Sequence, residues 1–244
     1  MNTEKRIYDI VSNIDVDSVQ KLFDKRANMN NGFTSVLLGD QNPGYAQIWD
    51  EYEKKMILPK LDLTGNENFI DIGCGIGRWA EAVIPHCRYY CGCDFSSEMI
   101  MKAKERITYP DARFDFVNCS FQQIGDYVKD YSFDRGIIAG LCMYINDYDL
   151  KSCFDTFLKL VSEHAIFYFT ETVAIEKRLT LNGFYSDAMH TEYSSIYRTP
   201  QEYNELYAAF RNAGFEFVEQ GFLPHLNNER EYSETDRWYT ILKR

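Results

Sequence analysis

The sequence predicts an α/β protein with a doubly wound, mostly parallel sheet. From residue 68 onward, short apolar segments alternate with amphipathic segments of about 10 to 15 residues that have helical spacing. Strands joined by such helices pair in parallel through right-handed crossovers, which place helices on both faces of the sheet. The length of 244 residues, with 45% hydrophobic and 26% charged residues, fits one globular domain with a modest lid.

Seven segments after residue 65 have strand character. They are 68–72, 89–94, 114–118, 135–140, 165–171, 215–222 and 237–244. Four helical segments lie between them, at 78–84, 96–107, 149–161 and 200–214. Ser96 and Pro200 stand at helix starts, and Gly214 stands where the last helix should be capped.

Two regions do not follow this alternation. Residues 1–65 read as a helical cap, with apolar residues at helical spacing in 18–30 and 45–56 and with Pro59 ending the second helix. Residues 171–199 are polar and rich in tyrosine, and they are too long for an ordinary connection. We therefore expect them to form an insertion that covers the substrate.

Composition excludes several classes of function. The net charge of −11 repels phosphate backbones and anionic lipids, so no nucleic-acid or membrane partner is expected. The N-terminus lacks the pattern of a secretory signal, and the seven cysteines lie mostly in apolar segments, which favours reduced thiols in a cytoplasmic protein. Neither these cysteines nor the four histidines have the spacing of a metal site, so no metal is expected.

A glycine-rich loop is the most informative motif. Gly73, Gly75 and Gly77 directly follow a predicted strand and open a helix, where backbone can approach a ligand and free N–H groups can point at it. The Gly-x-Gly-x-Gly spacing differs from the Gly-x-Gly-x-x-Gly of dinucleotide folds. Asp71 precedes the loop, and a carboxylate there suits an ammonium or sulfonium better than a pyrophosphate. Asp94 ends the second strand, where an acid can bind both hydroxyls of a ribose.

Together these residues resemble the class I S-adenosylmethionine-dependent methyltransferases. The motif resemblance covers roughly residues 66–170 and implies a Rossmann-like sheet of seven strands whose last strand is antiparallel. It implies a cofactor-binding methyltransferase domain over 66–244, with 1–65 as its lid. The N-terminal segments are similar to those of small bacterial methyltransferases that act on sugars or other metabolites.

The resemblance implies S-adenosylmethionine as cofactor, with S-adenosylhomocysteine as product. Asp71, Gly73, Cys74 and Gly75 would face its methionine portion, Arg78 its carboxylate and Asp94 its ribose. The further cofactor positions implied are Gly77, Phe95, Met99, Ser120, Phe121, Ala139 and Gly140. Where the family often has an acid that contacts the adenine amine, this chain has Asn118 to Phe121, so Ser120 or a backbone group would serve.

The acceptor side is predicted from segments that should border the cleft. Tyr144 follows the fourth strand, Glu171 follows the fifth, and His190 is the one histidine of the 171–199 insertion, which makes these three the catalytic candidates. The candidates for acceptor binding are Arg26, Tyr45, Tyr193, Tyr197 and Arg198. Glu192 is a further candidate base.

The expected reaction is methyl transfer to an O or N atom of a small molecule such as a sugar or a nucleotide-linked metabolite, by a monomer or homodimer. A protein or peptide N-terminus is the next acceptor class, because an acidic groove suits a basic peptide. Two alternatives belong to other classes: an inactive cofactor-binding partner subunit and, least favoured, an NAD-dependent oxidoreductase. No serine triad, Walker loop or zinc-hydrolase spacing competes.

Overall fold

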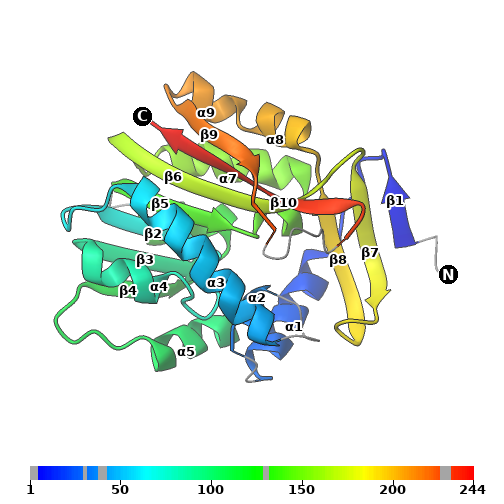
Figure 1. The fold of residues 1–244 in the computed structure, drawn as a ribbon, viewed down its shortest axis with the longest axis horizontal. Helices are drawn as coiled ribbons and strands as arrows, with labels where there is room; N and C mark the ends of the chain where they lie inside the picture. The colour runs from blue at the N-terminus through cyan, green and yellow to red at the C-terminus, as the bar shows by residue number, and fades with distance from the viewer. Residues whose placement is uncertain (1–4, 30–31, 38–42, 129–131, 226–231) are drawn as a thin grey trace.

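The computed structural model describes residues 5–29, 32–37, 43–128, 132–225 and 232–244. Seven strands form the main sheet in the order β4-β3-β2-β5-β6-β10-β9 (Figure 1). They are β2 (Asn68–Ile72), β3 (Tyr89–Asp94), β4 (Phe114–Asn118), β5 (Phe133–Ala139), β6 (Val161–Ala174), β9 (Glu216–Phe222) and β10 (Thr235–Lys243). The pairs among β4, β3, β2, β5 and β6 are parallel, while β10 runs antiparallel to both β6 and β9. The predicted fold, including its antiparallel last strand, is confirmed.

Helices cover both faces of this sheet. On one face lie α3 (Pro43–Ile57), α4 (Ala80–Val83) and α5 (Ser97–Arg106), which share an apolar core with the strands. On the other lie α6 (Ile124–Tyr127), α7 (Asp147–Leu158), α8 (Pro200–Leu206) and α9 (Ala208–Asn212), packed through a largely aromatic core. Side chains of successive strand residues alternate between these two cores, as expected for strands buried on both faces.

The N-terminal region differs in part from the predicted helical cap. Its helices are α1 (Val16–Ala27), α2 (Thr34–Leu37) and α3, and the short η2 (Leu58–Leu61) follows α3. However, β1 (Arg6–Tyr8) is a strand, and it pairs with a second sheet rather than packing as a helix. Asp15 caps α1 by accepting from Asp17 N, and Lys25 and Arg26 lie in its last turn.

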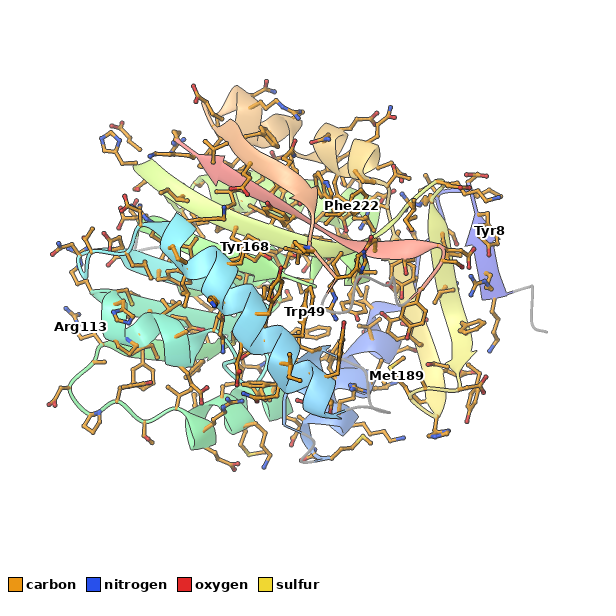
Figure 2. All side chains as sticks on the ribbon, in the orientation of Figure 1. Tyr8, Trp49, Arg113, Tyr168, Met189 and Phe222 are labelled. Carbon is orange, nitrogen blue, oxygen red and sulfur yellow. The ribbon has the colours of Figure 1, made fainter. Side chains whose placement is uncertain are left out.

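The segment predicted as a covering insertion is a β-hairpin. β6 extends to Ala174, and β7 (Leu179–Ser186) and β8 (Thr191–Tyr197) then form a small antiparallel sheet with β1. Leu179, Leu181, Tyr193 and Ile196 of these strands are buried in one apolar cluster with residues of the N-terminal region. Figure 2 shows Tyr8 on β1 at the outer edge of this sheet and Met189 near the hairpin tip.

Short 3-10 segments complete the fold. They are η3 (Ile84–His86), η4 (Phe121–Gln123) and η5 (Cys142–Tyr144). The helix predicted at 78–84 is only one α-turn long because Pro85 follows it. The helix predicted at 200–214 bends at Tyr207 into α8 and α9. None of the helices in the described ranges combines the length and apolar character that a membrane crossing needs.

Candidate functional site

The glycine loop lies where the carboxyl ends of β2, β3 and β5 meet. Gly73, Gly75 and Gly77 all have positive φ, which L side chains rarely adopt. Gly73 N and Cys74 N both donate to the carbonyl of Cys93, at 2.8 and 2.9 Å. The loop is therefore fixed against the end of β3 and exposes its inner edge to a cavity.

Asp94 joins this loop to the start of α5. One carboxylate oxygen accepts from Gly75 N at 2.9 Å, and the other accepts from Ser96 N at 2.9 Å. Burial raises the pKa of Asp94 to about 6, although both backbone hydrogen bonds oppose the rise. Each oxygen keeps a further lone pair with which it can accept a ligand hydroxyl.

Asp71 and Arg78 occupy the opposite side of the loop. Tyr90 donates to Asp71 at 2.7 Å, and burial raises the pKa of Asp71 to about 6. Arg78 is buried and bound through Nη1 to Asp50 at 3.0 Å and Glu53 at 2.7 Å, both on α3. The predicted contact of Arg78 with a cofactor carboxylate thus competes with two acids, and this arginine links the loop to α3.

A first cavity, the cofactor cavity, brings most predicted cofactor residues together. Those that line it are Gly73, Gly75, Asp94, Phe95, Met99, Ser120, Phe121, Ala139 and Gly140, and the predicted catalytic residue Tyr144 lines it as well. Val36 of α2 and Phe23 of α1 line it from the N-terminal region. Gly77 has a packing role instead, because a Cβ there would lie 3.1 Å from Ile107.

A second cavity, the junction, continues from the first past Gly73 and Gly140. Asp71, Cys74, Arg78 and Glu171 line it, with Met143 and Thr172 at its far side. Met143 and Thr172 also line the third cavity, so the three spaces adjoin one another. The methionine-facing residues predicted from sequence therefore lie between the cofactor cavity and a further pocket.

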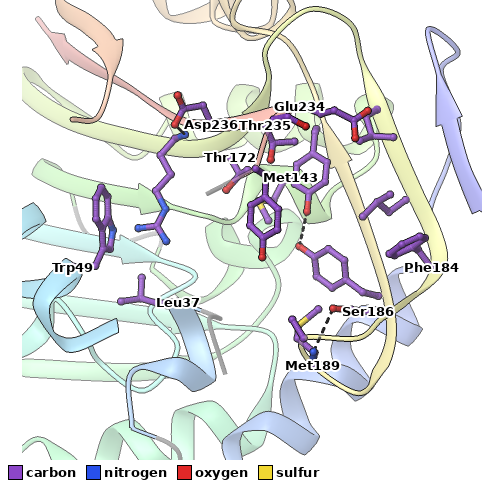
Figure 3. A pocket seen from close by; sticks show the side chains of 18 of the residues that line it. Leu37, Trp49, Met143, Thr172, Phe184, Ser186, Met189, Glu234, Thr235 and Asp236 are labelled. Atoms are coloured by element: carbon purple, nitrogen blue, oxygen red, sulfur yellow. Dashed lines mark hydrogen bonds between the residues drawn. The ribbon is translucent and has the colours of Figure 1, made fainter. Parts of the chain in front are cut away.

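The third cavity lies between the hairpin, α3 and β10, and we name it the acceptor cavity after the predicted acceptor residues that line it. Figure 3 shows Trp49 on one side and Phe184 on the other, with Thr172, Thr235 and Asp236 along the sheet side. The predicted acceptor residues Tyr45, Tyr193 and Tyr197 line it. Its polar lining includes the ion pair of Arg6 with Glu234, and His225 Nε2 lies 3.2 Å from a carboxylate oxygen of Asp236. Aromatic rings and paired charges suit a small polar molecule with a flat or apolar face.

Tyr144 lies at the boundary of these cavities. It lines the cofactor cavity and the junction, and its hydroxyl lies 2.9 Å from that of Tyr193 on β8. Burial raises the pKa of both phenols well above the ordinary value, so both hydroxyls are neutral at physiological pH. The Phe23 ring packs edge-on against Tyr144, with ring centroids 5.1 Å apart.

Four predicted residues do not have the surroundings expected of them. His190 is exposed at the hairpin tip, with φ of 51°, and lines none of the three cavities described. Arg26 is buried and donates to the carbonyls of Thr34 and Ser35, which ties α1 to α2. Arg198 is fully buried and bound to Asp147 and to backbone carbonyls, and it does not line the cavity that holds the other predicted acceptor residues, so its acceptor role stays a prediction. Glu192, on the outer face of β8, pairs with Lys5.

Glu171 lies in the junction, but its carboxylate faces backbone. It accepts from Leu141, Cys142 and Met143 N–H groups. Burial raises the pKa of Glu171 to about 7 against these hydrogen bonds.

Several lining residues were not predicted from the sequence. Trp49 was recognised only as part of an amphipathic helix, and Met143, Thr172 and Arg237 carried no motif. The guanidinium of Arg237 lies 4.1 Å from the centroid of the Trp49 ring, which fixes this aromatic wall. Pairing of β10 with β6 brings Arg237 opposite Thr172, a juxtaposition that only the sheet order reveals. Within the described residues, no group of three or more His, Cys, Asp or Glu side chains is placed to hold a metal ion.

Comparison with known proteins agrees with this geometry. Residues 69–164 match the model of a family described as a methyltransferase domain. Phosphoethanolamine N-methyltransferase 1 of Caenorhabditis elegans is 27% identical over 164 residues, which are 57% of this chain and 33% of that protein. A 23S rRNA (uracil(1939)-C(5))-methyltransferase of Francisella tularensis is 28% identical over 71 residues, 28% of this chain and 16% of that protein. The chain thus spans a third or less of these curated relatives.

Solved structures share the fold at low identity. Phosphoethanolamine N-methyltransferase 1 of Haemonchus contortus, in complex with phosphoethanolamine and S-adenosylhomocysteine, has a TM-score of 0.71 at 19% identity and covers 93% of this chain and 48% of that one. Magnesium protoporphyrin IX methyltransferase of Synechocystis, with bound S-adenosylmethionine, has a TM-score of 0.62 at 14% identity. The match covers 96% of this chain and 99% of that one. The resemblance to class I S-adenosylmethionine-dependent methyltransferases is confirmed, while the small bacterial subtype stays a prediction.

Proposed function

We propose that this chain binds S-adenosylmethionine and transfers its methyl group to an O or N atom of a small molecule. One observation carries the proposal. The cavity at the glycine loop and Asp94 adjoins an aromatic-lined cavity through a junction bordered by Asp71, Tyr144 and Glu171. The methyltransferase-domain match and the neighbours with bound S-adenosylmethionine or its product support this assignment.

The residues present fit this cofactor. Asp94, held by Gly75 N and Ser96 N, would accept the ribose hydroxyls. Asp71 would face the methionine ammonium, with Gly73 and Cys74 beside it. The predicted adenine-side residues Phe95, Met99, Ser120 and Phe121 and the backbone of Ala139 and Gly140 complete the lining.

The absence of a Cβ in the loop is part of the fit. A Cβ at Gly75 would lie 2.5 Å from Val36, so α2 packs directly over the loop. In this proposal α1 and α2 act as a lid on the cofactor cavity, and the β7–β8 hairpin covers the acceptor.

S-adenosylmethionine, when bound, supplies a methyl group activated by a sulfonium for in-line displacement. The chain's own residues then have to align an acceptor and exclude water, and such alignment can contribute about 7–11 kcal/mol. Tyr144 is the predicted catalytic residue best placed for this, because it lines both the cofactor cavity and the junction. A general base is required only where the acceptor must lose a proton during attack.

The aromatic lining of the acceptor cavity supports a small molecule over a peptide N-terminus, which remains the second acceptor class. The neighbours act on phosphoethanolamine, a 23S rRNA uracil and magnesium protoporphyrin IX by their names, which spans several acceptor chemistries. Transfer of labelled methyl from S-adenosylmethionine to a panel of sugars, nucleotide-linked metabolites, amines and peptides tests the proposal. Uptake by one compound class supports it; cofactor binding with no uptake by any class favours the inactive partner subunit.

A further inference from the structure

The turn Leu141–Ile145, which contains η5, separates the cofactor cavity from the acceptor cavity. Leu141, Tyr144 and Ile145 line the first, and Met143 lines the third. The position of this turn therefore sets where Tyr144 stands relative to both ligands.

Glu171 of β6 binds the N–H side of the turn. Its carboxylate accepts from Leu141 N at 3.2 Å, Cys142 N at 2.8 Å and Met143 N at 3.2 Å. The residue is 2% exposed, so water does not replace these contacts. Oε1 accepts from the first two N–H groups and Oε2 from the third, so both carboxylate oxygens hold the turn.

Arg198, which follows β8, binds the carbonyl side of the same turn. Its Nη1 donates to Cys142 O at 2.8 Å and its Nη2 to Ile145 O at 2.6 Å. Its Nε donates to Asp147 at 2.7 Å, and Arg178 holds that aspartate from the start of the hairpin. A planar fork of donors is needed to reach all three acceptors, and a lysine cannot supply it.

We infer that Glu171 and Arg198 are positioning residues that clamp the turn Leu141–Ile145 from both sides and so fix Tyr144 between the two ligands. That Tyr144 takes part in catalysis rests on the proposed function. The clamp is inferred from the hydrogen bonds alone. Cys142 is held on both its N–H and its carbonyl.

The hairpin contacts the turn at a second point. Tyr193 of β8 meets the Tyr144 hydroxyl at 2.9 Å, and the two rings pack edge-on at 6.1 Å. Tyr193 also lines the acceptor cavity. Arg198 and Tyr193 thus join one wall of the acceptor cavity to the turn that borders the cofactor, which couples the two cavities.

The test compares clamp variants with matched controls elsewhere in the fold. Arg198→Lys and Glu171→Gln each weaken one side of the clamp. Asp147→Asn weakens the ion pair that holds Arg198, and Asp147 itself is partly exposed. Glu67→Gln is the matched control for Glu171, because Glu67 accepts from Thr64, Gly65 and Asn66 N–H groups in another turn.

Arg135→Lys is the matched control for Arg198. Arg135 donates to the carbonyls of Leu61 and Asp62, away from the cavities. Each protein carries 3-fluorotyrosine at Tyr144, and its fluorine resonance and its affinity for S-adenosylhomocysteine are measured.

The clamp variants should broaden or split the resonance of Tyr144 and weaken S-adenosylhomocysteine binding about tenfold. Both controls should leave the resonance and the affinity at wild-type values. A wild-type resonance in folded clamp variants, or equal changes in the controls, would overturn the inference. Should Arg198→Lys fail to fold, the resonance and the affinity of Glu171→Gln and Asp147→Asn decide on the inference. Should the wild-type protein bind no S-adenosylhomocysteine, the proposed function fails, while the fluorine resonance still decides on the clamp.

Discussion

The carboxylate of Asp94 accepts a hydrogen bond from the backbone N–H of Gly75 at 2.9 Å. This contact binds the end of β3 to the glycine loop after β2, so the two motifs singled out in the sequence form one unit. Because Ser96 N holds the other oxygen, the carboxylate has a fixed orientation before any ligand arrives.

Replacing this carboxylate should weaken cofactor binding. For Asp94→Asn we expect a loss of S-adenosylhomocysteine affinity of about 10- to 100-fold, since hydrogen bonds to a charged group are worth about 1.5–3 kcal/mol. Isothermal titration measures it. Asp115→Asn, an exposed change on the neighbouring strand β4, is the control and should bind normally. Equal affinity in both variants would contradict the assignment of Asp94.

A side chain at Gly75 should disturb the lid. The residue has φ of +53°, and a Cβ would lie 2.5 Å from Val36. We expect Gly75→Ala to displace α2, lower the melting temperature and weaken binding by more than about tenfold. Gly221→Ala serves as the control, because a Cβ there would lie 3.8 Å from Tyr239, an ordinary van der Waals distance. Normal binding by Gly75→Ala would show that α2 does not cover the cofactor.

Asp71 should make stability depend on pH. Burial raises its pKa from 3.8 to about 6, so the folded chain holds this proton more tightly than the unfolded chain. The raised pKa contributes about 3 kcal/mol to the free energy of unfolding. This contribution is fully present below about pH 4 and is lost as pH rises through about 6. Denaturant unfolding from pH 4 to 8 should therefore show a flatter profile for Asp71→Asn than for wild type. Parallel profiles would contradict the raised pKa.

The Tyr144 hydroxyl should matter for transfer but not for cofactor binding. Tyr144→Phe keeps the ring that borders the cofactor cavity and loses the contact with Tyr193. We expect S-adenosylhomocysteine affinity within about twofold of wild type and a methyl-transfer rate lowered at least about tenfold. The rate is measured with an acceptor found by screening. The exposed Tyr127→Phe is the control. An unchanged rate would remove Tyr144 from the catalytic candidates.

Sequence reasoning was most successful where local pattern and structure coincide. Gly73, Gly75 and Asp94 were recognised because the loop, the strand ends and the positive φ values all follow from neighbouring residues. The alternation of strands and helices likewise predicted the sheet, since parallel pairing leaves few possible orders.

The acceptor side depends on contacts between distant segments, which no local pattern records. The polar segment around Arg198 predicts an acceptor-binding residue, whereas the structure buries Arg198 and bonds its guanidinium to the carbonyls of Cys142 and Ile145. His190 was favoured because it is the one histidine of that segment, and the hairpin turn carries it outward. Trp49 reads as an ordinary core residue of α3, and only β10 and the hairpin opposite make it a cavity wall.

On the proposed function, the cavity beside Asp94 and the glycine loop binds S-adenosylmethionine. The most direct test is calorimetric titration of the purified chain with S-adenosylmethionine, S-adenosylhomocysteine and NAD(H). We expect micromolar binding of the two methionine-derived ligands and no response to NAD(H). Binding of NAD(H) alone, or no binding of either methionine-derived ligand, would contradict it.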